Sequence, residues 1–295
     1  MHFKKNIISL YGKQGEDWLY NLPNLVKQFA KIWGLSNLKV LPNLTYNYAL
    51  SCTQGNIPTV LKLGFYNPEL QYEIQALKLF AGHGCVAIIE HDFEQGAILL
   101  QRAVPGTSLK TLFPKQDREA TLIASQIIKD LQNIKPHKLD DLPGVEDWLA
   151  TLDKNWNIPK QYLEKARELK KFLLATTTHK ALLHGDLHND NILSCGDNQW
   201  ISIDPKGGIG DPVYEVGAPV RNPVPKTIKN DAVQKIIEGR IDLLAEFLEF
   251  DRQRIFDWAF VQVVLGACWS LENRLDPAFF LKMAEAFAAI EKYKS

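Results

Sequence analysis

The stretch His184-Gly185-Asp186-Leu187-His188-Asn189-Asp190-Asn191, with the apolar run that ends in Ile203-Asp204-Pro205, is the most informative part of this sequence. Asp186 can accept a proton from an incoming hydroxyl, while Asn191 and Asp204 offer oxygen ligands to a metal ion. Phosphoryl transfer passes through a loose transition state, so an enzyme for it mainly positions its substrates and neutralises charge. The spacing of these three residues therefore predicts a phosphoryl-transfer centre.

The surrounding sequence supports this interpretation, although each residue also has an ordinary alternative. Residues 192–193 and 200–203 are apolar and predict two short strands on either side of the metal site. Taken singly, Asp186 could cap a helix, Asn191 could stabilise a turn, and Asp204 could begin the turn that follows it. Their occurrence together, on a strand-loop-strand pattern, favours the functional interpretation.

Composition limits the class of partner. The chain has 295 residues, enough for two lobes, and 34 basic residues balance 34 acidic ones, so the sequence indicates neither nucleic-acid nor membrane-surface binding. No stretch approaches the ~20 apolar residues of a membrane span, and the apolar run at 7–10 is too short for a signal peptide. The four cysteines lack metal-site or disulfide spacing and predict reduced thiols in a cytoplasmic protein (Cys52, Cys85, Cys195, Cys268). We expect a small-molecule substrate; the sequence does not indicate the oligomeric state.

The first third of the chain is predicted to be rich in strands. We expect a short helix over residues 23–33, ended by Gly34, and a second over 68–81, ended by Gly82. The alternation of apolar and polar residues predicts five strands, over residues 38–41, 48–53, 59–65, 85–90 and 97–101.

The remainder is predicted to be mostly helical. Helix-period apolar positions occur over residues 118–134, 145–156, 160–176, 231–250, 252–273 and 277–293. These elements predict an α+β fold with two lobes, a nucleotide-binding lobe over residues 1–103 and a helical catalytic and substrate-binding lobe over 104–295. The joint falls where a strand stops before Pro105-Gly106.

A lysine and a glutamate in the first lobe are candidates for holding phosphates. Lys62 lies on a predicted strand and points away from Leu61 and Leu63, and Glu73 lies on the helix that follows. A strand lysine paired with a helical glutamate can fix an ammonium group against α- and β-phosphate oxygens. Alone, each residue would be better explained as a solvated surface charge; together with the motif around Asp186, we favour the functional pair.

The rest of the nucleotide site leaves less trace in the sequence. We expect the adenine under the joint between the lobes, bound by the backbone carbonyl of Gln101 and the N–H of Ala103. The turn over residues 42–47 would cover the phosphates, with Asn43, Thr45 and Asn47 as its polar residues. This turn lacks a glycine-rich motif, and an ordinary hairpin loop is the alternative.

These motifs together resemble the aminoglycoside phosphotransferase branch of the protein-kinase-like fold, most closely the streptomycin 6-kinase group of aminoglycoside/hydroxyurea resistance kinases. The resemblance runs through nearly the whole chain. It is carried by Val60-Leu61-Lys62-Leu63-Gly64, His184-Gly185-Asp186-Leu187-His188, Ile203-Asp204-Pro205-Lys206-Gly207, Gly210-Asp211-Pro212-Val213-Tyr214-Glu215 and Arg221-Asn222-Pro223.

The resemblance implies roles for individual residues. It implies ATP and Mg²⁺ as cofactors, with Asp186 as the catalytic base, Asn191 and Asp204 as Mg²⁺ ligands, and Lys62 with Glu73 as the phosphate-anchoring pair. It implies that Asp211 is structural and accepts hydrogen bonds from the backbone of the catalytic loop. Two positions depart from the family pattern: Gln101 replaces a common acidic residue, and Glu215 a common aspartate.

A protein substrate is disfavoured. Only six residues separate Asp204 from Asp211, which leaves no long segment on which a peptide could dock, and His188 stands where protein kinases have a lysine. The acceptor is therefore expected to be a small alcohol. An aminoglycoside such as streptomycin would need carboxylates to bind its cationic groups.

Three residues are candidates for binding the acceptor: Asp190, Glu272 and Trp269. Glu272 could instead be a solvated helix charge, and Trp269 a core aromatic. Two other functions remain open, a metabolic kinase acting on choline, a sugar or hydroxyurea, and a catalytically silent nucleotide-binding module. The intact set of polar residues argues against the silent module.

Overall fold

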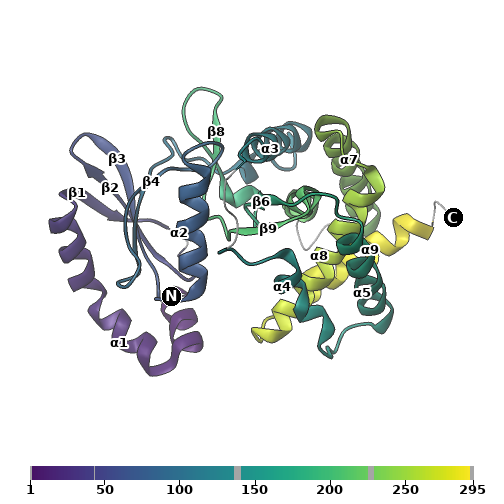
Figure 1. The fold of residues 1–295 in the computed structure, drawn as a ribbon, viewed down its shortest axis with the longest axis horizontal. Coiled ribbons are helices and arrows are strands. Elements are labelled where there is room, and N and C mark those ends of the chain that lie inside the picture. The colour runs from purple at the N-terminus through teal and green to yellow at the C-terminus, as the bar shows by residue number, and fades with distance from the viewer. Residues whose placement is uncertain (1, 43, 136–140, 225–228, 293–295) are drawn as a thin grey trace.

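The computed structural model describes residues 2–42, 44–135, 141–224 and 229–292, which form two lobes side by side (Figure 1). The smaller lobe is built on one antiparallel sheet with the strand order β1-β2-β3-β5-β4. The strands are β1 (Leu35–Val40), β2 (Tyr48–Gln54), β3 (Ile57–Leu63), β4 (Ile88–Asp92) and β5 (Ala97–Gln101). Helices α1 (His2–Ile32) and α2 (Pro68–Phe80) complete this lobe.

The two faces of this sheet pack against different helices. On β5, Ala97 and Leu99 join the core beneath α1, whereas Ile98 and Leu100 join the core beneath α2. Side chains alternate between the faces of a strand, so one strand can serve both cores. The same alternation on β3 places Leu61 in the α1 core and Lys62 on the face toward α2.

The first helix is much longer than the sequence predicted. The expected start at residue 23 was wrong, because α1 begins at His2, is interrupted at Gly12 (φ 54°) and continues through Pro23. Proline is often the first residue of a helix, which favoured the later start. The buried Phe3, Ile7 and Leu22 explain why the additional turns form, since each belongs to the core that α1 shares with the sheet.

One predicted strand is divided between the two lobes. Residues 85–90 were expected to form a single strand of the small sheet, but β4 begins only at Ile88. The residues before it pair with the large lobe: the Val86 N–H donates to the carbonyl of Ser202 at 2.9 Å, and Cys85 forms a β-bridge to the same residue. The connection therefore ties the two lobes together at Ser202, two residues before Asp204.

The larger lobe is mainly helical. Its helices are α3 (Asp117–Gln132), α4 (Val145–Leu149), α5 (Lys160–Ala175), α6 (Gly217–Arg221), α7 (Asn230–Leu248), α8 (Arg252–Glu272) and α9 (Ala278–Lys292). The helix expected over 145–156 stops at Leu149 and continues only as a 3₁₀ turn over Ala150–Asp153. Among the described residues, α8 alone is long and apolar enough to cross a bilayer, and 83% of its most apolar stretch is buried within the fold.

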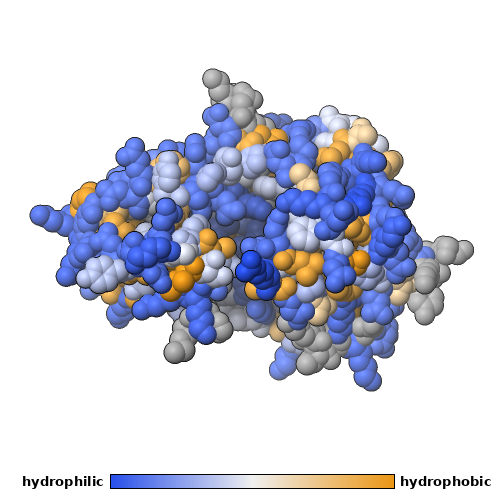
Figure 2. Space-filling view, turned by 90° about the horizontal axis from the view of Figure 1, so that it is seen from below, coloured by the Kyte–Doolittle hydropathy of each residue, from blue (hydrophilic) through white to orange (hydrophobic). Residues whose placement is uncertain are grey.

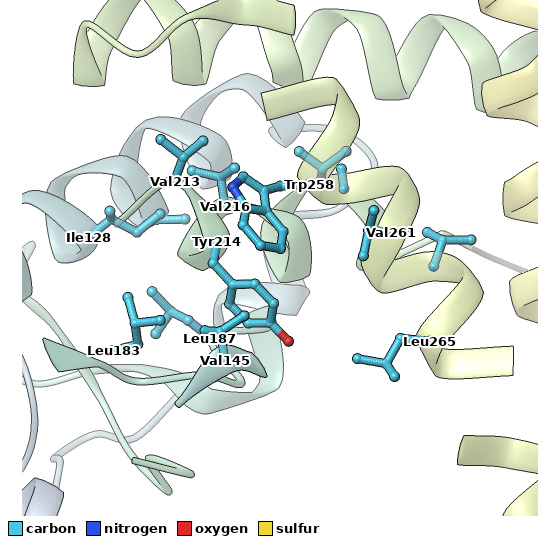
Figure 3. Packing of buried hydrophobic residues seen from close by; sticks show 14 of the residues in the cluster. Ile128, Val145, Leu183, Leu187, Val213, Tyr214, Val216, Trp258, Val261 and Leu265 are labelled. Carbon is cyan, nitrogen blue, oxygen red and sulfur yellow. The ribbon is translucent and has the colours of Figure 1, made fainter. Parts of the chain in front are cut away.

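Two short two-stranded sheets flank the polar residues of the candidate site in the large lobe. The strands β7 (Ile192–Ser194) and β8 (Trp200–Ser202) form the predicted pair. The sequence did not predict the second pair, β6 (Ala181–Leu183) and β9 (Gly208–Gly210), because the two strands lie far apart in the chain and glycine is depleted in strands. Figure 3 shows Leu183, Tyr214 and Trp258 converging in the core that supports these strands. The predicted α+β bilobal fold is confirmed, and we propose that the lobes divide near residue 103.

Candidate active site

The loop that follows β6 presents Asp186 to solvent. Its side chain is 46% exposed, while Leu187 beside it is fully buried, so the loop is anchored on one side and open on the other. Gly185 adopts φ 81°, and a Cβ on it would lie 2.5 Å from Trp148. A residue with a side chain would therefore be strained and would clash, which explains the glycine before the candidate base.

His184 joins this loop to the segment that carries Asp204. Its Nε2 lies 2.9 Å from the carbonyl oxygen of Ile203, and its Nδ1 accepts from the N–H of Asp186 at 3.3 Å. These partners fit a neutral ring protonated on Nε2. Burial lowers the pKa of His184 to about 4. The backbone carbonyl of His184 also accepts from the N–H of Lys206 at 2.8 Å.

The carboxylate that holds the catalytic-loop backbone belongs to Glu215. It accepts from the N–H groups of His184 and Gly185 at 2.7 and 3.0 Å. Burial raises the pKa of Glu215 to about 7, although these two donors act in the opposite direction. The family pattern implied this role for Asp211, and that prediction was wrong. The longer glutamate side chain, at the position noted as a departure, makes these bonds instead.

Asp211 has a different structural task. It accepts hydrogen bonds from the guanidinium of Arg254 and from the indole N–H of Trp258, both on α8, and from the N–H of Val213. The carboxylate is 5% exposed. Asp211 therefore fixes the 3₁₀ turn over Pro212–Val216 to the central helix, and Glu215 on that turn then fixes the loop.

The structure brings Lys62, Glu73 and Asp204 together. The Lys62 ammonium lies 2.6 Å from Glu73 Oε1 and 3.1 Å from Asp204 Oδ1. Burial acts to raise the pKa of Asp204, but the ammonium outweighs it and holds that pKa below its usual value. Burial acts to lower the pKa of Lys62, but Asp204 and Glu73 outweigh it and raise the pKa. Burial raises the pKa of Glu73, although Lys62 acts to lower it, and the lysine bridges the two lobes.

The two predicted metal ligands also lie at one place. The N–H of Ile203 donates to the carbonyl of Asn191 at 2.9 Å, which sets Asn191 beside the strand that leads to Asp204. The amide nitrogen of Asn191 donates to the carbonyl of Asp186 at 3.0 Å, so its amide oxygen is turned away from the loop. Asp204 adopts φ 56° and its side chain is 47% exposed. One amide and one carboxylate oxygen fit Mg²⁺, which keeps several waters and binds substrate phosphates.

The predicted adenine contacts lie at the end of β5. The N–H of Ala103 donates no hydrogen bond within the described part of the chain, and Ala103 is 8% exposed. The side chain of Gln101 is used locally, where it accepts from the N–H of Ala87 at 3.3 Å. In the predicted phosphate-covering turn, Thr45 is exposed and its carbonyl accepts from Asn6. Asn43 lies outside the described residues.

The candidate acceptor residues are not gathered in one place. Trp269 lines a cavity of about 670 Å³, together with Glu69, Tyr72, Asp141, Leu142, Pro143, Asp147, Trp148, Thr151 and Lys206. Figure 2 shows the hollow, largely hydrophilic surface between the lobes. Asp190 and Glu272 do not line this cavity. They are paired with Lys110 at 2.9 Å and with Lys154 at 2.7 Å.

Sequence reasoning assigned no role to Lys206 or Trp148, although both face this cavity. The Lys206 ammonium lies 4.9 Å from the ring centre of Trp148 and 4.1 Å from that of Trp269. Burial lowers the pKa of Lys206, while Asp186 acts to raise it, which places the ammonium in the field of the candidate base. The only available signal was the position of Lys206 two residues after Asp204.

The sequence matches the aminoglycoside/hydroxyurea antibiotic resistance kinase family over residues 48–274. This range includes the whole cluster from Lys62 to Glu215. The chain belongs to this family. It is therefore a phosphotransferase that acts on hydroxyl groups, as the predicted resemblance implied.

Two relatives span most of the chain. A streptomycin 6-kinase from Streptomyces glaucescens is 25% identical over 91% of this chain and 90% of its own. A hydroxyurea phosphotransferase from Kitasatospora aureofaciens is 27% identical over 89% of this chain and 77% of its own. The two relatives differ in acceptor at nearly equal identity, so identity alone does not select between these acceptors.

Among solved structures, a thermostable mutant of an aminoglycoside phosphotransferase, in ternary complex with ADP and hygromycin B, is similar to this chain. The TM-score is 0.63 at 14% identity, and the match covers 90% of this chain and 97% of the other. At this identity the likeness concerns the fold, which agrees with the two lobes described above.

Proposed function

We propose that this protein transfers the γ-phosphoryl group of ATP, with Mg²⁺, to a hydroxyl of an aminoglycoside such as streptomycin. The observation that carries the proposal is the Lys62 ammonium, which lies 2.6 Å from Glu73 of the small lobe and 3.1 Å from Asp204 of the large lobe. This arrangement suits a triphosphate, because one fixed cation and one metal-binding carboxylate meet at the joint between the lobes.

The proposed reaction has one chemical step. Asp186 accepts the proton of the acceptor hydroxyl, its oxygen forms a bond to the γ-phosphorus, the bond from that phosphorus to the β–γ bridging oxygen breaks, and ADP leaves. Asn191 and Asp204 would hold the Mg²⁺, which when bound neutralises charge on the phosphate oxygens. Lys62 binds the α- and β-phosphates, and the backbone of Gln101 and Ala103 binds the adenine. Thr45 covers the phosphates.

The acceptor is proposed to occupy the cavity lined by Trp148 and Trp269. The cavity adjoins the catalytic loop, because Trp148 packs against Gly185, and about 670 Å³ is a usual volume for a small-molecule site. Glu69, Asp141 and Asp147 supply carboxylates at its rim, which suits the ammonium and guanidinium groups of an aminoglycoside. Asp190 and Glu272 are already paired with lysines and are weaker candidates.

The test is ADP release from purified protein, measured with ATP and Mg²⁺ against streptomycin, other aminoglycosides, hydroxyurea and small alcohols. The proposal expects release that depends on streptomycin and is lost in Asp186→Asn. Streptomycin-dependent release that survives in Asp186→Asn would contradict the assigned base. Release with another acceptor alone would keep the chemistry and overturn the proposed substrate.

One observation favours a second candidate, hydroxyurea or another small neutral alcohol. The Lys206 ammonium already lies against both tryptophan rings, where a guanidinium group would otherwise bind. A neutral acceptor would not be repelled by it. The panel of acceptors decides between the two candidates. A Lys206→Met variant adds a second test: it should lower the KM of a cationic acceptor and leave the KM of hydroxyurea nearly unchanged.

A further inference from the structure

Arg221, the last residue of α6, lies beside the candidate base without a role in the reaction described so far. Its side chain is 12% exposed, and its Nη2 atom is 3.9 Å from Asp186 Oδ1. Within the described part of the chain, Asp186 is the only acidic residue within 4.0 Å of this guanidinium. On the other side of the same carboxylate, His188 Nε2 lies 3.7 Å from Oδ2.

The guanidinium is held in place by a buried amide. Arg221 Nη1 donates to Gln262 Oε1 at 2.7 Å, and the amide nitrogen of Gln262 donates to the carbonyl of Tyr214. Gln262 is 6% exposed on α8. The amide fits only because residue 217 is glycine, since a Cβ there would lie 2.4 Å from its carbon. The structure therefore reserves space for the group that orients Arg221.

The backbone around Arg221 is fixed as well. A second buried arginine, Arg240, donates to the carbonyls of Val220 at 3.1 Å and Pro223 at 2.9 Å, on either side of Arg221. Arg240 is itself neutralised by Asp117, with its Nη2 2.6 Å from Oδ1. The two arginines differ in this respect, because Arg240 has a close carboxylate and Arg221 has only the more distant Asp186.

A purely structural role does not account for this arrangement. A neutral side chain could tie α6 to α8 through Gln262 without placing a cation in a buried site, where charge is disfavoured unless it is well paired. The Nε and Nη2 atoms of Arg221 make no hydrogen bond within the described residues. These donors are therefore free for Asp186. Catalytic hydrogen bonds are often long in the absence of substrate and shorten when it binds.

We propose that Arg221 is a positioning residue, which holds Asp186 by Oδ1 so that Oδ2 faces the acceptor hydroxyl. The inference rests on the proposed role of Asp186 as the base. Since Arg221 acts through Asp186, its loss lowers kcat and leaves the binding of ATP and of the acceptor nearly unchanged. Its effect also disappears once Asp186 is replaced.

The experiment is a double-mutant cycle of Arg221→Gln and Asp186→Asn, with ADP release measured for streptomycin, for hydroxyurea and for water as acceptors. Arg221→Gln should lower kcat on the order of 10²-fold, the loss expected from a misplaced group, with KM values changed less than about 3-fold. In the Asp186→Asn background the same substitution should have no further effect. Arg221→Lys, which keeps the charge and is less disruptive to folding, should restore part of kcat.

A matched control is Arg252→Gln, because Arg252 on α8 pairs with Asp242 at 2.6 Å and not with the catalytic loop. It should leave kcat unchanged. A higher KM with an unchanged kcat in Arg221→Gln would make Arg221 an acceptor-binding residue, and the inference would be wrong. The inference would also be wrong if Arg221→Gln lowered kcat further in the Asp186→Asn background. If Asp186→Asn alone left activity intact, the proposed base would fail, which is a separate outcome from failure of Arg221.

Discussion

Glu215 Oε2 accepts a 2.7 Å hydrogen bond from the backbone nitrogen of His184, so a side chain of the 3₁₀ turn over Pro212–Val216 fixes the backbone of the loop that carries Asp186. The second oxygen of Glu215 binds the N–H of Gly185. Both bonds end one or two residues before Asp186. The position of the candidate base therefore depends on a residue that does not touch it.

Replacing Glu215 by alanine should impair both folding and catalysis. Two N–H groups lose their acceptor, and each unsatisfied donor costs about 1–3 kcal/mol, so the free energy of unfolding should fall by roughly 2–6 kcal/mol. Because the loop is then released, kcat should fall further than the folded fraction does. Urea unfolding and ADP release on the same preparation measure the two effects.

Asp211→Asn is the contrasting variant. It weakens the contacts of the turn to Arg254 and Trp258 on α8, while the bonds of Glu215 to the loop remain. We expect a loss of stability with kcat per folded molecule little changed. A large loss of kcat in Asp211→Asn, with Glu215→Ala nearly normal, would restore the role that the family pattern implied.

The role of Glu215 could not be predicted from the sequence, for a physical reason. Asp204, Asn191 and Lys62 were selected from the sequence because the chemistry proposed for them depends on residue type and spacing, and the structure places Lys62 and Asn191 close to Asp204 and its strand. The partners of a backbone N–H leave no such pattern, and Asp211 and Glu215 are both acidic residues of one short segment. The three-residue strands β6 and β9 were missed for a related reason, since they are defined by pairing with distant residues and not by their own alternation.

The pH dependence of stability should reveal His184 and Glu215 separately. The pKa of His184 is lowered to about 4, so its stabilisation is complete above pH 6.5 and is lost as the pH falls toward 4. The pKa of Glu215 is raised to about 7, so its contribution is complete below pH 4.5 and is lost as the pH rises toward 7. Between pH 4.5 and 6.5 the two effects oppose each other.

Glu215→Gln removes one of these two opposing contributions. Its free energy of unfolding should fall by about 3 kcal/mol more than that of the parent between pH 7 and pH 4, because the pKa of Glu215 is raised from 4.5 to about 7 and each pH unit of that difference corresponds to ~1.4 kcal/mol. Urea titrations at several pH values measure this difference. Parallel pH profiles for parent and variant would show that Glu215 is already ionised at pH 5 in the folded protein.

Asp204→Ala should remove the Mg²⁺ dependence of ATP binding. Asp204 is the one carboxylate among the proposed metal ligands, and Asn191 alone provides a neutral oxygen. Calorimetric titration with ATP, with and without Mg²⁺, tests this, and Asp197→Ala on the exposed turn between β7 and β8 is a suitable control. A metal dependence equal to that of the parent would mean that another residue holds the ion.

The last prediction concerns the acceptor. If streptomycin is the substrate, expression of this chain in a sensitive bacterium should raise streptomycin tolerance, and Asp186→Asn should cancel the gain, because a general base contributes on the order of 10²-fold or more to the rate.

Glu69→Gln should separate cationic from neutral acceptors. Glu69 lines the cavity and forms no ion pair within the described residues, so its charge is available to a bound cation. We therefore expect a higher KM for streptomycin, an unchanged KM for hydroxyurea, and no effect from Glu90→Gln on the exposed strand β4. Equal KM changes for both acceptors would mean that Glu69 does not bind a substrate cation, and hydroxyurea-dependent ADP release without any streptomycin-dependent release would assign the neutral acceptor.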